Sequence, residues 1–272
     1  MIDIHAHYIP DWDDGPKSLD VSLQMCERAV ADGITDVILT PHLYRVTRHG
    51  DNLDLLSSRF TEFVGEAQSS GLRFHRGNEI LIVHNLVDVV KSSPEVRLAN
   101  SCYVLVELPE GSVPPGIGEM FYKLQLEGFT PVIAHPERNA VFQEHPEELF
   151  ELISHGALTQ VTAQSITGQF GHRARKSVEH FLRNKWVHVI ASDAHSVNSR
   201  EPLLSKGRAA AAEIVGEEIA RILVVDAPNS ILRDQAMPDI GDPIPVKTSN
   251  RFSVRLPSLF RSRKEEEPTQ DE

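Results

Sequence analysis

The sequence contains little cysteine. Its 272 residues include two, Cys26 and Cys102, which are too few for a disulfide framework and do not form a paired metal motif. Such usage is typical of a reducing compartment, so we expect a cytoplasmic protein. There is no run of about 18 apolar residues and no basic and apolar leader at Met1. We therefore expect no transmembrane segment and no export by a standard signal.

Excess positive charge is also absent. The formal net charge is −12, whereas a general nucleic-acid binder needs a basic surface. The composition therefore argues against nucleic acid as a partner. A chain of this length can bury a large core without disulfides, and it is typical of one α/β barrel or two smaller domains.

Apolar, β-branched segments alternate with amphipathic ones along the chain. We predict strands at 1–4, 35–40, 73–79, 102–107, 130–134, 157–162 and 187–192. We predict helices at 18–32, 52–70, 116–127, 146–155, 172–184 and 205–225, and a last helical turn at 226–234. About seven strand–helix repeats indicate a parallel sheet. No glycine-rich phosphate loop follows the first strand, so a closed α/β barrel is favoured over a doubly wound nucleotide-binding sheet.

The composition changes after Met237. Residues 238–272 contain several prolines, a basic stretch from Arg251 to Lys264 and an acidic end. We predict a barrel domain over residues 1–236 and a disordered tail over 237–272. A solvated tail is the simpler interpretation, and weak contact of its basic part with an acidic surface or membrane headgroups is the alternative.

Histidines and carboxylates end six of the seven predicted strands. The carboxyl ends of parallel barrel strands build the active site, and residues two apart in a strand share a face. The nine candidate ligands are His5, His7, Asp14, His42, Glu79, Glu107, His135, Asp193 and His195. Each alone could be a strand-end charge or a hydrogen-bonded histidine, but nine at one end of one sheet indicate a metal site. Imidazole and carboxylate without thiolate suit Mn, Fe or Zn, and nine ligands imply two or three ions.

Two arginines follow these ligands in the expected site loops. Arg138 follows His135 in HPER, and Arg200 follows SDAH. A guanidinium offers a planar fork that matches phosphate oxygens. Either arginine alone could be a salt-bridge residue, but the pair beside a metal cluster predicts a phosphoryl substrate. Arg45 and His49, in the loop after His42, are left open for an accessory role.

The complete motif set resembles the polymerase-and-histidinol-phosphatase (PHP) superfamily. More narrowly, IDIHAH, DWDDGPKS, GITDVILTPH and IAHPER resemble its bacterial protein-tyrosine phosphatase branch, the CpsB/CapC type that is encoded with capsule and exopolysaccharide machinery. The likeness extends from residue 1 to about 235. It implies a distorted (β/α)7 barrel that holds three divalent metal ions, commonly manganese.

The resemblance also implies a role for each candidate residue. It places His5, His7, Glu79 and Asp193 on the first ion, Glu79, Glu107 and His135 on the second, and Asp14, His42 and His195 on the third. Arg138 and Arg200 match the phosphate-binding arginines of the family. The implied activity is hydrolysis of phosphotyrosine on the tail of a bacterial tyrosine kinase that regulates polysaccharide export.

The expected chemistry is in-line attack on phosphorus by a hydroxide that bridges two metals. A phenol leaves with a pKa of about 10 and needs little general-acid help. A cysteine mechanism is excluded because the position six after each cysteine holds Asp32 or Leu108 instead of arginine. The same metal cluster could serve a small-molecule phosphatase, such as one acting on histidinol phosphate, or a phosphodiesterase. A non-catalytic module that binds a kinase or scaffold is a further alternative, and the sequence leaves the oligomeric state open.

Overall fold

The computed structural model describes residues 1–44 and 49–246. The strands in these residues are β1 Ile2–Ala6, β2 Asp36–Leu39, β3 His42–Leu43, β4 Arg73–Arg76, β5 Glu79–Leu81, β6 Tyr103–Glu107, β7 Thr130–Ala134, β8 Leu158–Thr162 and β9 Val189–Ala191. The helices are α1 Leu19–Ala31, α2 Leu53–Glu66, α3 Leu86–Ser92, α4 Ile117–Leu126, α5 Ala140–Glu144, α6 Pro146–Ser154, α7 Ala163–Ile166, α8 Gly171–Arg183, α9 Ser205–Val215, α10 Glu217–Arg221 and α11 Ala227–Leu232. Short 3₁₀ turns cover Gln68–Ser70, Pro94–Val96, Leu98–Asn100 and Pro136–Arg138, and a π-helical turn covers Ile222–Asp226.

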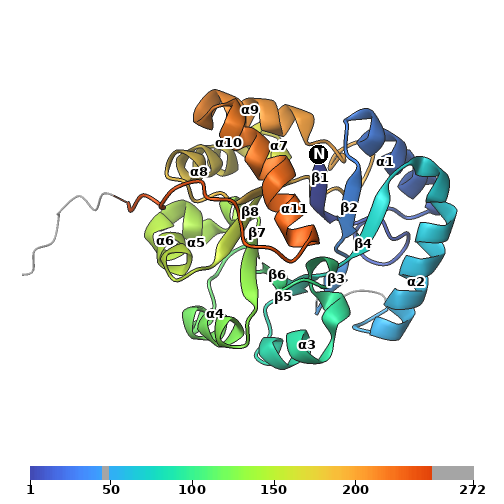
Figure 1. The fold of residues 1–272 in the computed structure, drawn as a ribbon, viewed down its shortest axis with the longest axis horizontal. Helices are drawn as coiled ribbons and strands as arrows, with labels where there is room; N and C mark the ends of the chain where they lie inside the picture. Colours follow the sequence, from blue (N-terminus) through green and yellow to red (C-terminus); the bar gives the residue numbers. More distant parts are fainter. Residues whose placement is uncertain (45–48, 247–272) are drawn as a thin grey trace, which may run out of the picture.

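The parallel strands lie at the centre of the molecule with helices around them (Figure 1). They form a three-stranded sheet, β1-β2-β4, and a six-stranded sheet, β3-β5-β6-β7-β8-β9. The pairs β2–β4 and β3–β5 are the two halves of one interrupted strand pair, since β3 directly follows β2 and β5 directly follows β4. A bridge between Ala6 and Ala194 joins β1 to the end of β9. Seven strand positions therefore close into a distorted (β/α)7 barrel, as predicted.

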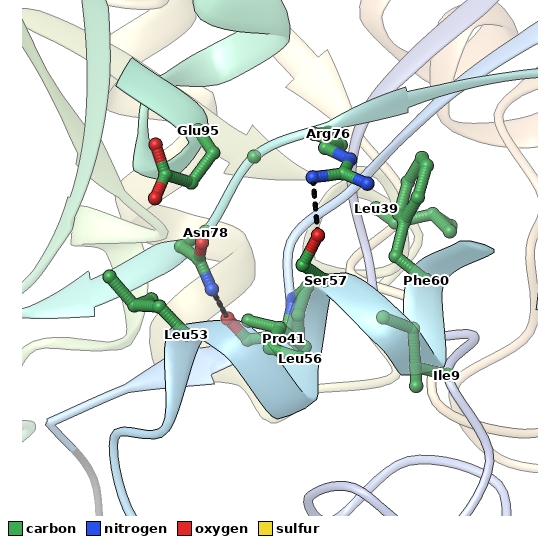
Figure 2. Close-up of a pocket in the computed structure, with 11 residues that line it drawn as sticks. Ile9, Leu39, Pro41, Leu53, Leu56, Ser57, Phe60, Arg76, Asn78 and Glu95 are labelled. Carbon is green, nitrogen blue, oxygen red and sulfur yellow. Dashed lines mark hydrogen bonds between the residues drawn. The ribbon is translucent and has the colours of Figure 1, made fainter. Parts of the chain in front are cut away.

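The interruption corrects the prediction of one strand over 73–79. β4 ends at Arg76 and β5 begins at Glu79, while Pro41, which lacks an N–H for the ladder, interrupts the neighbouring strand. The Asn78 side-chain amide donates to the Pro41 carbonyl over 2.8 Å, and so joins the two breaks (Figure 2). A Cβ at position 77 would lie 2.8 Å from Cγ2 of Ile38, so the close approach requires Gly77. The hollow beside this junction holds about 20 Å³, room for about one water.

The helices follow their sequence signals closely. Ser18 and Asn52 accept hydrogen bonds from the first turns of α1 and α2, which is the expected capping role of these residue types. The predicted helix over 205–225 is divided at Gly216, whose φ of 85° cannot continue a helix. Helices α3, α5 and α7 were not predicted. α11 lies over the strands (Figure 1), and its Ile231 joins Ile4 in one buried apolar cluster.

The segment after α11 is irregular as far as residue 246. Ile244 accepts a hydrogen bond from the Trp186 indole over 2.9 Å, and its amide donates to the Asn184 carbonyl over 2.9 Å. The predicted domain boundary at 236/237 stays a prediction, and residues 247–272 of the predicted tail lie outside the described residues. No helix among residues 1–44 and 49–246 is long and apolar enough to span a membrane.

Candidate metal centre

The structure brings the nine candidate ligands together at one end of the barrel. Their nitrogen and oxygen atoms fall into groups in which one atom of each residue lies within 4.8 Å of the others. These groups are His5, His7, Glu79 and Asp193; His7, Asp14, His42 and His195; and His42, Glu79 and Glu107. His135 joins them through its Nε2 atom, which lies 2.6 Å from Oε1 of Glu79.

The first group agrees with the set expected for the first ion. Nε2 of His5 and Nε2 of His7 lie 3.3 Å apart, so both rings project to one point although the pairing of β1 shifts register between Asp3 and Ala6. Oε2 of Glu79 lies 3.2 Å from His5 Nε2 and 3.3 Å from His7 Nε2. Oδ1 of Asp193 lies 3.3 Å from His5 Nε2. Two imidazoles and two carboxylates thus converge in a fully buried space.

The other two groups differ in detail from the expected sets. His42 lies between them, with Nδ1 3.0 Å from Glu79 Oε2 and Nε2 3.3 Å from Asp14 Oδ1. His7 adds to the set of Asp14, His42 and His195. Asp14 is half-exposed, whereas the other eight candidates are buried. Among the nine candidate ligands Asp14 is therefore the one open to solvent in residues 1–44 and 49–246, and it marks a side that a substrate can reach.

Two residues that the sequence reasoning passed over orient the histidines. Oδ2 of Asp13 accepts from Nδ1 of His7 over 2.8 Å, and Oε1 of Gln160 accepts from Nδ1 of His5 over 2.8 Å. Each bond places the ring proton on Nδ1 and turns Nε2 toward the cluster. Partners of this kind fix ring orientation and raise ligand basicity at metal sites. A sequence signal existed for Gln160, a polar residue inside the apolar strand LTQVT, while Asp13 resembled an ordinary turn residue.

Two candidate ligands have an unusual backbone conformation. His135 has a φ of 33° and Asp193 a φ of 52°. Non-glycine residues at positive φ are costly, and they cluster at functional sites. The buried Asp3 stabilises the second of these turns, since it accepts from the backbone N–H of Ser192 over 3.0 Å and from the Ser192 hydroxyl. Both turns direct their side chains to the cluster.

The electrostatics of the cluster fit divalent cations. Among the described residues, Oε2 of Glu79 and Oδ1 of Asp193 are buried without a hydrogen-bond partner. Burial favours neutral His5, but the charges of Glu79 and Asp193 outweigh burial and raise the pKa of His5 to about 9. Burial and the nearby Arg138 lower the pKa of His135 to about 4, which leaves a free nitrogen lone pair. The carboxylates thus hold a proton on His5, a positive charge that a divalent cation could supply in its place, whereas His135 is already a neutral imidazole.

Both predicted arginines reach the cluster through one atom. Nη2 of Arg138 lies 2.6 Å, and Nη2 of Arg200 2.5 Å, from Oδ2 of Asp193. Asp193 therefore directs one oxygen to the arginines and the other to His5. Among the described residues, the buried Nε atoms of both arginines have no hydrogen-bond partner. Two guanidinium groups with N–H groups to spare beside a metal-binding cluster can hold a phosphate.

The loop after His42 is described in part. His49 donates from Nε2 to the carbonyl oxygen of Asp11 over 2.9 Å, and its ring stacks on Trp12 with centroids 5.2 Å apart. This contact fastens the loop to the acidic turn that carries Asp14. Arg45 lies outside the described residues. In this structure His49 therefore supports the loop through its contacts with Asp11 and Trp12.

Comparison with known proteins agrees with this geometry. The family model described as "Capsular polysaccharide synthesis, CpsB/CapC" matches residues 1–233. The chain is 36% identical over 208 residues to CapC of Staphylococcus aureus, covering 76% of this chain and 81% of CapC. It is 32% identical over 258 residues to the tyrosine-protein phosphatase YwqE of Bacillus subtilis, covering 93% of this chain and 99% of YwqE.

A solved structure shows the same architecture. It comes from a study of YwqE from Bacillus subtilis and CpsB from Streptococcus pneumoniae, described as metal-dependent tyrosine phosphatases. It superposes with a TM-score of 0.81 at 31% identity and covers 91% of this chain and all of that chain. The phosphotriesterase of Mycobacterium tuberculosis shares the fold alone, with a TM-score of 0.54 at 12% identity. With its barrel, its buried ligand cluster and a family match over residues 1–233, this chain belongs to the CpsB/CapC family.

Proposed function

We propose that this chain is a metal-dependent phosphatase that hydrolyses phosphotyrosine. The observation that carries the proposal is the double role of Asp193, whose oxygens face His5 on one side and the paired arginines on the other. A phosphate held by Arg138 and Arg200 would lie directly beside the ions. The tyrosine-protein phosphatase name of YwqE, together with the family membership, supports phosphotyrosine as the substrate class.

The proposed metal content is three divalent ions, with manganese the first choice and iron or zinc the alternatives. His5, His7, Glu79 and Asp193 would hold the first, Glu79, Glu107 and His135 the second, and Asp14, His42 and His195 the third, with His7 close to the last set. Bound ions of this kind supply an activated nucleophile at neutral pH and neutralise charge on phosphorus oxygens.

The side chains of the protein perform the rest of the reaction. The Arg138 and Arg200 guanidinium groups, each bound at one N–H by Asp193, orient the phosphoryl oxygens and stabilise the charge that they carry in the transition state. Asp13 and Gln160 keep the protons of His7 and His5 on Nδ1. The leaving phenolate of tyrosine has a pKa of about 10, so a strong general acid is not required.

The biological partner follows as a proposal from the capsule-synthesis family. We propose the phosphotyrosine-bearing tail of a bacterial tyrosine kinase, in the cytoplasm, as the physiological substrate. The two cysteines, both free in this structure, suit a reducing compartment.

The test is phosphate release by the manganese-loaded protein. A phosphotyrosine peptide should be hydrolysed, and a chelator should abolish turnover. Faster hydrolysis of histidinol phosphate would assign the site to a small-molecule phosphatase instead. Absence of turnover on both, with intact metal binding, would favour a non-catalytic binding module.

One substitution tests the cluster itself. His135→Ala removes the ring that contacts Glu79 at 2.6 Å and should abolish turnover while leaving the fold largely intact by circular dichroism. The control is His155→Ala, which removes an exposed histidine at the end of α6. Unchanged turnover in the His135 variant would refute the second-metal assignment.

A further inference from the structure

Strand β8 supplies none of the candidate ligands, but the chain that follows it carries Phe170, an aromatic residue beside Arg138. After β8 the chain forms α7 and a tight turn, in which Gly171 N–H donates to the Gly168 carbonyl over 3.0 Å. This turn places Phe170 directly before α8, and α8 packs on the 3₁₀ turn that contains Arg138. The Arg138 Cζ atom lies 4.9 Å from the centroid of the Phe170 ring.

The two contacts of Arg138 constrain different parts of its guanidinium. The carboxylate of Asp193 binds one edge, at Nη2, and a single hydrogen bond leaves the plane free to rotate about it. The Arg138 Cζ atom lies over the Phe170 ring, which is the favourable arrangement of a cation on an aromatic quadrupole. Because a guanidinium uses its N–H groups for hydrogen bonds, this second contact holds the group without occupying a donor.

Arg200 provides an internal comparison. It binds the same Asp193 oxygen, and Nη1 lies 3.7 Å from Oδ2 of Asp14. No aromatic ring covers its guanidinium within residues 1–44 and 49–246, where three arginine–aromatic pairs occur. Its side chain is 25% exposed, whereas that of Arg138 is 13% exposed. Arg138 is therefore the arginine whose orientation the protein controls more tightly.

We propose that Phe170 is a positioning residue for phosphate binding, acting through the guanidinium group of Arg138. This inference rests on the proposed role of Arg138. Phe170 is half-buried, and loss of its ring would let the fork rotate away from the phosphoryl oxygens. The loss of kcat/KM should be equal for every phosphomonoester, because Phe170 acts through the arginine that binds the phosphate and does not contact the leaving group.

The experiment compares Phe170→Leu with wild type in the full-length, manganese-loaded protein. We expect kcat/KM to fall about 3- to 30-fold, the range of a cation–π contact, by the same factor for a phosphotyrosine peptide and for p-nitrophenyl phosphate. The inhibition constant of inorganic phosphate should rise in parallel, and manganese affinity should stay unchanged. Phe170→Tyr should restore all of these values.

The matched control is Phe129→Leu. Phe129 is also half-buried and stacks on an arginine, with the Arg97 Cζ 5.3 Å from its centroid, but neither residue is among the site residues. This variant should keep wild-type kinetics.

A double-mutant cycle with Arg138→Ala separates the possible failures. If Phe170 acts through Arg138, adding Phe170→Leu to Arg138→Ala causes no further loss. Additive losses, or losses that differ between the peptide and p-nitrophenyl phosphate, would overturn the inference and indicate direct contact of Phe170 with the leaving group. Wild-type kinetics in Phe170→Leu with an impaired Arg138→Ala would also overturn it, and leave the proposed function intact. Wild-type kinetics in Arg138→Ala would instead refute the proposed role of that arginine, and this inference with it.

Discussion

Asp13→Asn is the sharpest test of how the cluster is supported. Asp13 accepts three hydrogen bonds, from Nδ1 of His7 over 2.8 Å, from the backbone N–H of His42 over 3.0 Å and from that of Gly15 over 2.9 Å. Burial opposes ionisation of Asp13, but His7 outweighs burial and holds the pKa of Asp13 below its usual value. The residue is therefore a charged acceptor that orients one candidate ligand by its ring and another by its backbone.

Asparagine has the same shape but offers one oxygen. If that oxygen replaces Oδ2, it keeps His7 and His42, and the amide group faces the buried N–H of Gly15. If it replaces Oδ1, both ligand contacts are lost. Either orientation leaves a buried donor unsatisfied, at a cost of about 1–3 kcal/mol. Both orientations also remove the negative charge beside His7, and loss of such a partner typically lowers metal affinity 10- to 100-fold, or about 1.4–2.7 kcal/mol.

The measurement is manganese binding by titration calorimetry, beside urea unfolding of the metal-free protein. Asp32→Asn is the matched control, because Asp32 accepts from the backbone N–H groups of Leu204 and Ser205 at the start of α9, away from the cluster. It should lose stability and keep metal affinity. Wild-type manganese affinity in Asp13→Asn would refute the reasoning.

The remaining predictions concern stability away from the cluster. Nδ1 of His188 accepts from the Thr159 N–H over 3.1 Å, and burial lowers the His188 pKa to about 4. A depressed histidine pKa contributes stability above the unfolded value of about 6.5, and this is lost as the pH falls toward 4. His188→Asn keeps an acceptor but cannot titrate, so its unfolding free energy in urea should fall about 1–2 kcal/mol less than that of wild type between pH 7 and 5. An equal fall would contradict the assignment. Gly207→Ala places a Cβ 2.5 Å from that of Ala163 and should destabilise the fold by about 1–3 kcal/mol in thermal unfolding. Gly65→Ala, with nothing within 4 Å of the added Cβ, is its control and should not destabilise.

The strand-end rule explains why the ligands could be read from the sequence. His42, Glu107 and His135 each stand at or just after the carboxyl end of a short apolar segment, and in a parallel barrel all such ends meet. The prediction needed no knowledge of long-range geometry beyond strand direction. For the same reason it identified the candidate ligands but not fully which of them lie together. The predicted set for the third ion, for example, lacks His7.

The residues that were missed act on other residues and not on an ion. Asp13 acts through its hydrogen bond to His7, and Gln160 through its hydrogen bond to His5. Gln160 lies far from His5 in the sequence. Phe170 acquires its place from a turn after β8 that no periodic pattern marks. Gln160 is marked as a polar residue inside the apolar strand LTQVT, but nothing local in the sequence distinguishes Asp13 or Phe170 from ordinary turn residues.

The breaks at Pro41 and Gly77 carried a readable local signal. Proline cannot donate to a sheet ladder, and glycine inside a strand marks a bend or a close approach. Pro41 directly follows the predicted strand 35–40, and Gly77 lies inside the predicted strand 73–79. What the sequence did not contain was the pairing, in which Asn78 joins the two breaks through the Pro41 carbonyl.

The division into two sheets has a consequence for local unfolding. β1, which carries His5, belongs to the three-stranded sheet, whereas Glu79 belongs to the other and Asp193 follows its last strand. An ion bound by the first group would therefore have ligands from both sheets and would cross-link them. Without it, the two sheets could open in separate local unfolding events. The free energy of metal binding at this point would add to the folding stability of the three-stranded sheet. Bound ions would therefore slow amide hydrogen exchange in β1, β2 and β4, in addition to their part in the reaction.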